Sequence, residues 1–181
     1  MGLTLVAGAA APPVSLYEVK QYCKIDIDDD DALLIVLINA ATAAAETFLG
    51  KAVNEQQWML TLPAFADEIE LHPGAVVAID SVQYLDEARV LQLLDPDTYI
   101  LDTTAQPSRL VLDPDQTWPA TADPRIPDVI QITFTTGPEE ADARVKVAIM
   151  AMVAQWNDNR IPGDMPSGIR SILQPLRRMV L

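Results

Sequence analysis

The chain is poor in the residues that most enzymes use for catalysis and that small secreted proteins use for cross-links. Its 181 residues include one cysteine and one histidine. A single Cys23 excludes an intramolecular disulfide and a cysteine-based zinc cluster, and it fits a reducing compartment. His72 precedes Pro73 at the end of a predicted strand, and no Gly-x-Ser-x-Gly motif supplies a nucleophile. The sequence therefore indicates no catalytic residue and no cofactor.

Positive charge is also scarce. Twelve Lys and Arg face 26 Asp and Glu, which gives a formal net charge of -14. This balance argues against a protein that binds nucleic acid by neutralising phosphates. The charge is uneven, because residues 1–140 hold 6 basic against 23 acidic residues, whereas residues 141–181 hold 6 against 3. We expect the basic C-terminal part to contact an acidic surface.

A long uncharged stretch is missing as well. The longest charge-free helical run, residues 32–45, is shorter than the roughly 20 residues that span a bilayer. Residues 1–14 are apolar, but they lack a basic region and contain Pro12 and Pro13, which is not typical of a signal peptide. We therefore expect no membrane partner and a flexible N-terminal arm at residues 1–14.

Two helices are predicted within residues 15–50. Ser15 and Glu18 form the pattern of a capping box, in which each side chain satisfies a free backbone N–H at a helix start. The four aspartates at residues 28–31 are favourable at a second helix N-terminus, where the macrodipole is positive. Gly50 is expected to end this helix, whose apolar positions recur at helical spacing: Leu33, Leu34, Leu37, Ile38, Ala41, Ala45 and Phe48.

An antiparallel β subdomain is predicted at residues 51–138, because the apolar period becomes alternating. The candidate strands are residues 58–62, 68–71, 78–85, 90–94, 98–101, 109–112 and 129–135. Residues 113–128 contain four prolines and are expected to form a long surface loop. Trp118 in this loop is the aromatic residue that we expect at a subunit interface.

The helical period returns at residues 139–181. Val145, Ile149 and Trp156 share one stripe of a helix that we expect to pack on the Ala-rich helix of residues 15–50. A final amphipathic segment carries Ile169, Ile172, Leu173 and Leu176, and its three arginines are candidate partner contacts: Arg170, Arg177 and Arg178. Together these patterns predict an α+β fold, in which N- and C-terminal helices form a bundle and a small antiparallel β subdomain is inserted between them.

The aspartates at residues 26, 28 and 30 match the first ligands of an EF-hand calcium loop. Asp31 stands where the loop requires Gly, however, and Leu37 stands where it requires a bidentate Glu. No metal site is therefore predicted, and the run is interpreted as a helix cap.

The two ends of the chain resemble the head-tail connector (adaptor) proteins of long-tailed phages. At the N-terminal end the resemblance lies in SLYEVK at residues 15–20, in IDIDDDD at residues 25–31 and in the Leu, Ile, Ala, Glu and Gly positions up to Gly50. At the C-terminal end it lies in VAIMAMVAQWNDNR at residues 147–160 and MPSGIRSILQPLR at residues 165–177.

The resemblance implies a structural, non-enzymatic virion subunit that is assembled in the bacterial host cytoplasm. Copies of the chain would form a ring, usually twelve-fold, between the portal protein and a tail-side connector or stopper. Genome DNA would pass through the channel without tight binding. Two alternatives stay open, namely a metal-dependent hydrolase that uses Asp28 to Asp31 and a soluble adaptor unrelated to phages.

Overall fold

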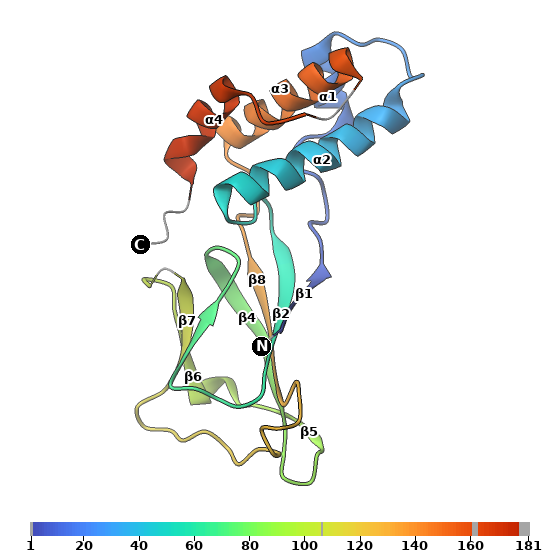
Figure 1. Ribbon diagram of the computed structural model, residues 1–181. Helices are drawn as coiled ribbons and strands as arrows, with labels where there is room; N and C mark the ends of the chain where they lie inside the picture. The colour runs from blue at the N-terminus through green and yellow to red at the C-terminus, as the bar shows by residue number, and fades with distance from the viewer. Residues whose placement is uncertain (1, 106, 161–162, 178–181) are drawn as a thin grey trace. The chain divides into compact units, whose positions relative to one another are not determined.

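The computed structural model of the chain describes residues 2–105, 107–160 and 163–177. These residues form two compact units. The sheet unit comprises the chain up to Gly8 together with Glu55–Gly137, and the helical unit comprises Ala9–Asn54 together with the chain from Pro138 onward (Figure 1). The prediction of a mixed α+β fold is confirmed.

The larger sheet of the sheet unit has five antiparallel strands in the order β1-β2-β8-β4-β5. Their bounds are β1 Gly2–Ala7, β2 Gln56–Leu62, β4 Val76–Leu85, β5 Leu91–Leu93 and β8 Ile130–Thr136. The central strand β8 pairs with β2 on one side and β4 on the other. Its residues alternate in burial, and Ile130, Ile132 and Phe134 are fully buried. Burial that alternates with a period of two is expected for a strand that packs one of its faces against a core.

The smaller sheet has three strands in the order β3-β7-β6. The strands are β3 Glu68–Leu71, β6 Tyr99–Asp102, which follows the short 3-10 turn Pro96–Thr98, and β7 Ser108–Leu112. Leu71 and Leu110 are fully buried and join Ile132 and Phe134 in one hydrophobic core. The seven predicted strands are all present, with ends shifted by no more than two residues.

One expectation about this region was wrong. Residues 2–7 are not a flexible arm, because they form β1 and pair with β2 from Gly2 opposite Thr61 to Ala7 opposite Gln57. The cause is that pairing with a strand some 50 residues away leaves no local mark on the sequence.

The helical unit contains α1 Leu16–Cys23, α2 Asp31–Leu49, α3 Ala143–Asn159 and α4 Ser167–Leu173, which continues as the 3-10 turn Gln174–Leu176. All four helices contribute to one core. Alanines such as Ala41 and Ala148 are fully buried within it and leave room for helix backbones to approach closely. The helix predicted from residue 139 begins at Ala143 because the side chain of Asp142 caps it. Of the predicted apolar stripe, Ile169 and Leu173 are buried, whereas Ile172 is 39% exposed.

Helix α2 is longer than its charge-free run. It continues past Glu46 to Leu49 and ends at Gly50, which has a positive φ of 67°. With 19 residues and a mean hydropathy of 1.9, α2 passes the length and composition criteria for a membrane-crossing helix. This corrects the expectation that no helical run of the chain is long enough to span a bilayer. In the helical unit one face of α2 supplies core residues: Leu34, Leu37, Ile38, Ala41, Ala45 and Leu49.

Candidate interaction surfaces of the helical unit

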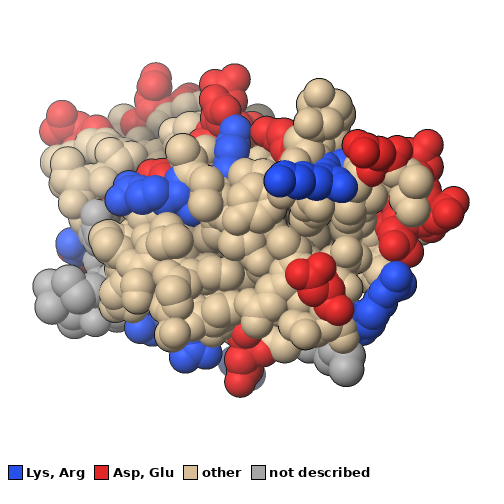
Figure 2. Space-filling model, turned by 90° about the horizontal axis from the view of Figure 1, so that it is seen from above, with Lys and Arg blue, Asp and Glu red and all other residues tan. Residues whose placement is uncertain are grey.

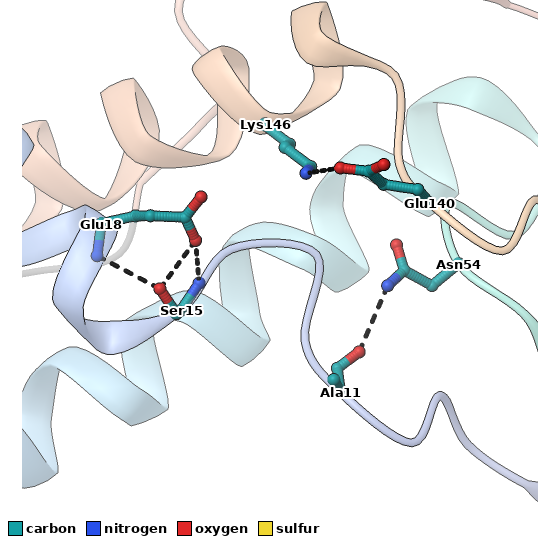
Figure 3. A network of polar contacts seen from close by, with 6 residues as sticks. All are labelled: Ala11, Ser15, Glu18, Asn54, Glu140 and Lys146. Atoms are coloured by element: carbon teal, nitrogen blue, oxygen red, sulfur yellow. Dashed lines mark hydrogen bonds and ion pairs between the residues drawn. The ribbon is translucent and has the colours of Figure 1, made fainter.

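The start of α1 is fixed by the predicted capping box. The Ser15 backbone N–H donates to Glu18 Oε2 at 2.7 Å, and the Glu18 backbone N–H donates to Ser15 Oγ at 3.2 Å (Figure 3). These hydrogen bonds from Ser15 lower the pKa of Glu18. Nearby, Lys146 Nζ donates to Glu140 Oε1 at 2.6 Å, and the Asn54 amide donates to the Ala11 carbonyl at 3.2 Å. The network thus fixes the segments that flank α1 and α3.

The acidic turn, which we define as residues 25–30 between α1 and α2, is organised by a lysine. Lys20 Nζ contacts Asp28 Oδ1 at 2.6 Å and Asp31 Oδ1 at 2.7 Å. Hydrogen bonding to Asp28 raises the pKa of Lys20, and the same bond lowers the pKa of Asp28. Asp30 lies 3.5 Å from the Arg160 guanidinium. Two of the aspartates that could have served a hydrolase thus share an ammonium group as their partner.

Among the residues that the structure describes, no group of three or more His, Cys, Asp or Glu side chains is placed to hold a metal ion. Asp30 is the N-cap of α2, but its side chain makes no capping hydrogen bond, so the favourable term there is the macrodipole. His72 lies in the sheet unit, 43% exposed, with its Nε2 atom 3.5 Å from Glu70 Oε2.

The acidic turn also carries an exposed apolar side chain. Ile27 is 59% exposed, although it stands between Asp26 and Asp28. Asp28 is itself 88% exposed, because Lys20 contacts only one side of it. The turn therefore exposes an apolar side chain that is flanked by carboxylates.

A groove lies beside the C-terminal half of α2, within the helical unit. It has a volume of about 570 Å³, and its lining residues come from α2, from the segment before α4 and from α4 itself: Ala43, Ala44, Thr47, Phe48, Gly163, Asp164, Met165 and Arg170. Most of this lining is apolar. Asp164 is the carboxylate among these residues and Arg170 is the cation.

The structure brings two of the predicted contact residues together at this groove. Arg170 lines it, and the Arg177 guanidinium lies over the Phe48 ring, 5.4 Å from the ring centroid. This distance is within the range of a cation–π contact. Arg178 lies outside the described residues. The groove therefore has an apolar floor with two arginines beside it.

Trp118 belongs to the other unit. Its ring stacks on Phe65 with a centroid distance of 4.3 Å and an interplanar angle of 1°, and it packs on the core of the sheet unit. Its indole Nε1 is buried without a hydrogen-bond partner among the described atoms. The loop is thus held partly by its own aromatic residue, and a role for Trp118 in a subunit interface stays a prediction.

The outer face of α2 is uncharged. It carries exposed residues at helical spacing, with Ile35 48% and Val36 62% exposed beside Ala32, Asn39 and Ala43. In the view of Figure 2, onto the helices, a broad uncharged area is bordered by groups of charged side chains. In a chain with 21% charged residues, such a face is typical of an interaction surface.

Sequence reasoning missed Ile27 and the groove. An isoleucine in an aspartate run is a detectable signal, because a solvated helix cap needs no large apolar residue. The groove had no comparable signal, because it combines residues 43–48 with residues 163–170, which only the packing of α4 brings together.

Comparison with known proteins agrees with the resemblance. The model of the phage gp6-like head-tail connector protein family matches residues 13–88. No curated protein sequence matches the chain.

Solved structures with the same fold come from gene transfer agent (GTA) particles. A chain in the neck of the empty particle, with C6 symmetry, is 19% identical with a TM-score of 0.80. A chain in the virion of the native particle is 20% identical, and one in the native neck with C12 symmetry is 21% identical, both with TM-scores of 0.79. Each likeness covers 100% of this chain and 97% of the other. The chain is thus similar to the phage gp6-like head-tail connector proteins over residues 13–88 and shares its fold with chains of the GTA neck.

Proposed function

We propose that the chain is a structural subunit of a phage or prophage head-tail connector. The match of residues 13–88 to the connector family carries this proposal, and the likeness to neck proteins over the full length supports it. Copies of the chain form a ring, which in this proposal is twelve-fold. The ring docks beneath the portal protein, extends the DNA channel and offers an attachment site to a tail-side connector or stopper.

In this proposal the work of the subunit is mechanical, and the chain is not an enzyme. It resides in the virion and is assembled in the bacterial host cytoplasm. The N- and C-terminal helices form one bundle, into which the β region is inserted. The net charge of -14 suits a channel wall, because like charge keeps a moving DNA duplex from adhering. Trp118, Arg170, Arg177 and Arg178 are proposed as partner contacts.

Mass measurement tests the proposal most directly. Purified protein is examined by light scattering and negative-stain imaging over a range of concentrations, alone and with its portal protein. We expect closed rings, either alone or on the portal, because head-to-tail contacts that close give rings. A protein that stays monomeric at high concentration and does not bind the portal contradicts the proposal.

DNA binding gives a second test. We expect no gel shift of duplex DNA at submicromolar protein in physiological salt, because the protein has no excess of positive charge with which to release counterions. Tight binding under these conditions would contradict a passive channel wall.

A further inference from the structure

Among the residues that the structure describes, none occupies the groove beside α2, and the chemistry of its lining indicates what would fill it. Ala43, Ala44 and Phe48 give an apolar floor, and Arg170 and Arg177 place positive charge at its side. Asp164 is the opposing charge in the lining. A volume of about 570 Å³ is in the range of pockets that enclose a small ligand, so a side chain with its neighbouring backbone has room.

The acidic turn has the complementary character. Ile27 is 59% exposed and is flanked by Asp26, Asp28 and Asp29. An apolar side chain that enters an apolar groove gains burial, while carboxylates around it meet arginines at the rim. The same turn placed on an uncharged or acidic surface would bring no further cation to these carboxylates, of which Asp28 alone already contacts Lys20 in its own copy.

These two surfaces cannot meet within one copy. The acidic turn precedes Asp31, the first residue of α2, whereas Phe48 lies in its last turn. A helix of this length separates its ends by roughly 27 Å, at 1.5 Å per residue. A contact between turn and groove is therefore a contact between two molecules.

We propose that the acidic turn of one copy docks in the groove of the next, with Ile27 on the apolar floor and the aspartates facing Arg170 and Arg177. The two surfaces differ, so the contact is head-to-tail and each pair of copies keeps one free turn and one free groove. Repeated around a closed circle, this arrangement gives a ring. The inference rests on the proposed function, since it names the contact by which the ring would form.

Two single substitutions test the contact, one on each surface. Ile27→Asp places a charge on the apolar side chain that docks, and Ala43→Phe fills the groove at an exposed position. Val77→Asp is the matched control, because Val77 is also 59% exposed, also β-branched, and lies on β4 of the sheet unit. Each protein is examined by sedimentation velocity and light scattering over a concentration series.

We expect the wild type and Val77→Asp to assemble alike. Ile27→Asp and Ala43→Phe should each need at least about tenfold more protein for half-assembly, which corresponds to about 1.4 kcal/mol per contact. An equimolar mixture of the two variants should give dimers of one copy of each, because the intact turn of Ala43→Phe fits the intact groove of Ile27→Asp. Longer chains should not form, since the remaining two surfaces of each dimer are damaged.

The charges are tested separately. Arg170→Glu and Asp29→Lys should each weaken assembly, and the double variant should restore it, because every contact in the ring then pairs the exchanged charges. If the double variant assembles no better than either single variant, the two substitutions act independently and the charge pairing is overturned.

The outcomes separate this inference from the proposed function. If the wild type forms rings and Ile27→Asp forms them equally well, the proposed contact between turn and groove is overturned, while the proposed function is supported. If Ile27→Asp abolishes binding to the portal but leaves self-assembly unchanged, the turn docks on the portal and the self-contact is again overturned. If the wild type forms no ring alone or on the portal, both proposals fail.

Discussion

Asp142 shows how a single side chain sets the start of α3. Its Oδ1 atom accepts a hydrogen bond from the Arg144 backbone N–H at 2.8 Å, and the Arg144 guanidinium donates to both carboxylate oxygens, at 3.1 and 2.9 Å. The side-chain and then the backbone hydrogen bonds from Arg144 lower the pKa of Asp142 to about 2. The cap is therefore charged through most of the acid range.

We expect Asp142→Ala to lower the free energy of unfolding at pH 7 by about 1 kcal/mol, the usual cost of a lost N-cap. Because the pKa of Asp142 in the folded protein lies below the ordinary aspartate value of 3.8, the charged cap stabilises fully above about pH 4, and its effect is lost as pH falls through about 2. Urea unfolding of the variant and the wild type should therefore converge towards pH 2. Asp142→Asn is the control, since it keeps an acceptor; an equal loss for Asn and Ala would contradict the capping role.

Residues were predictable from sequence where the interaction is local. The Ser15 and Glu18 capping box spans four residues, so its pattern alone identifies it, and the structure confirms it. The role of Lys20 could not be read in this way. Its partner Asp28 is eight positions away, and only the turn between α1 and α2 brings the two together.

The elements follow the same rule. Helix α2 and the strands were recognisable by period, whereas β1 was not, because its six residues are all exposed and show no apolar alternation. Helix α4 was also predicted from its apolar stripe. Two residues of this stripe, Ile169 and Leu173, are buried in the helical core, so removal of α4 would disturb folding.

The position of β1 at the edge of its sheet leads to a test. Deleting residues 2–7 removes a strand with no buried side chain, so we expect the rest of the sheet unit to stay folded. Hydrogen exchange should become faster at β2 amides that pair with β1, such as those near Thr61 and Met59. As a contrast, Leu60→Ala in β2, where Leu60 is 1% exposed, should cost roughly 2–5 kcal/mol. If the protein without residues 2–7 no longer unfolds cooperatively, β1 is needed for the folding of the whole sheet unit, which contradicts this prediction.

At the scale of the whole molecule, charge acts in two opposing ways. Copies that each carry -14 repel one another over long distances, while the proposed turn and groove attract at short range. The Debye length falls from about 30 Å at 0.01 M salt to about 8 Å at 0.15 M and about 3 Å at 1 M. Moderate salt should therefore relieve the repulsion before it weakens the close pairs.

We expect assembly to rise between 0.01 and about 0.15 M NaCl and to decline again towards 1 M. Light scattering at fixed protein concentration measures this, with the uncharged osmolyte sucrose at matched osmolality as the control. For Arg170→Glu the decline at high salt should disappear, because the attractive pair is already lost. A monotonic rise for the wild type would mean that no charge pair contributes to the contact.

The helical core combines residues 14–53 with residues 145–173, which lie far apart in the sequence. The order of synthesis gives this arrangement a consequence. On the ribosome, the acidic turn and α2 emerge early, but the groove waits for Met165 and Arg170. In the proposed contact, nascent chains therefore present the acidic turn before the groove has formed, and we expect assembly to begin only among nearly complete subunits.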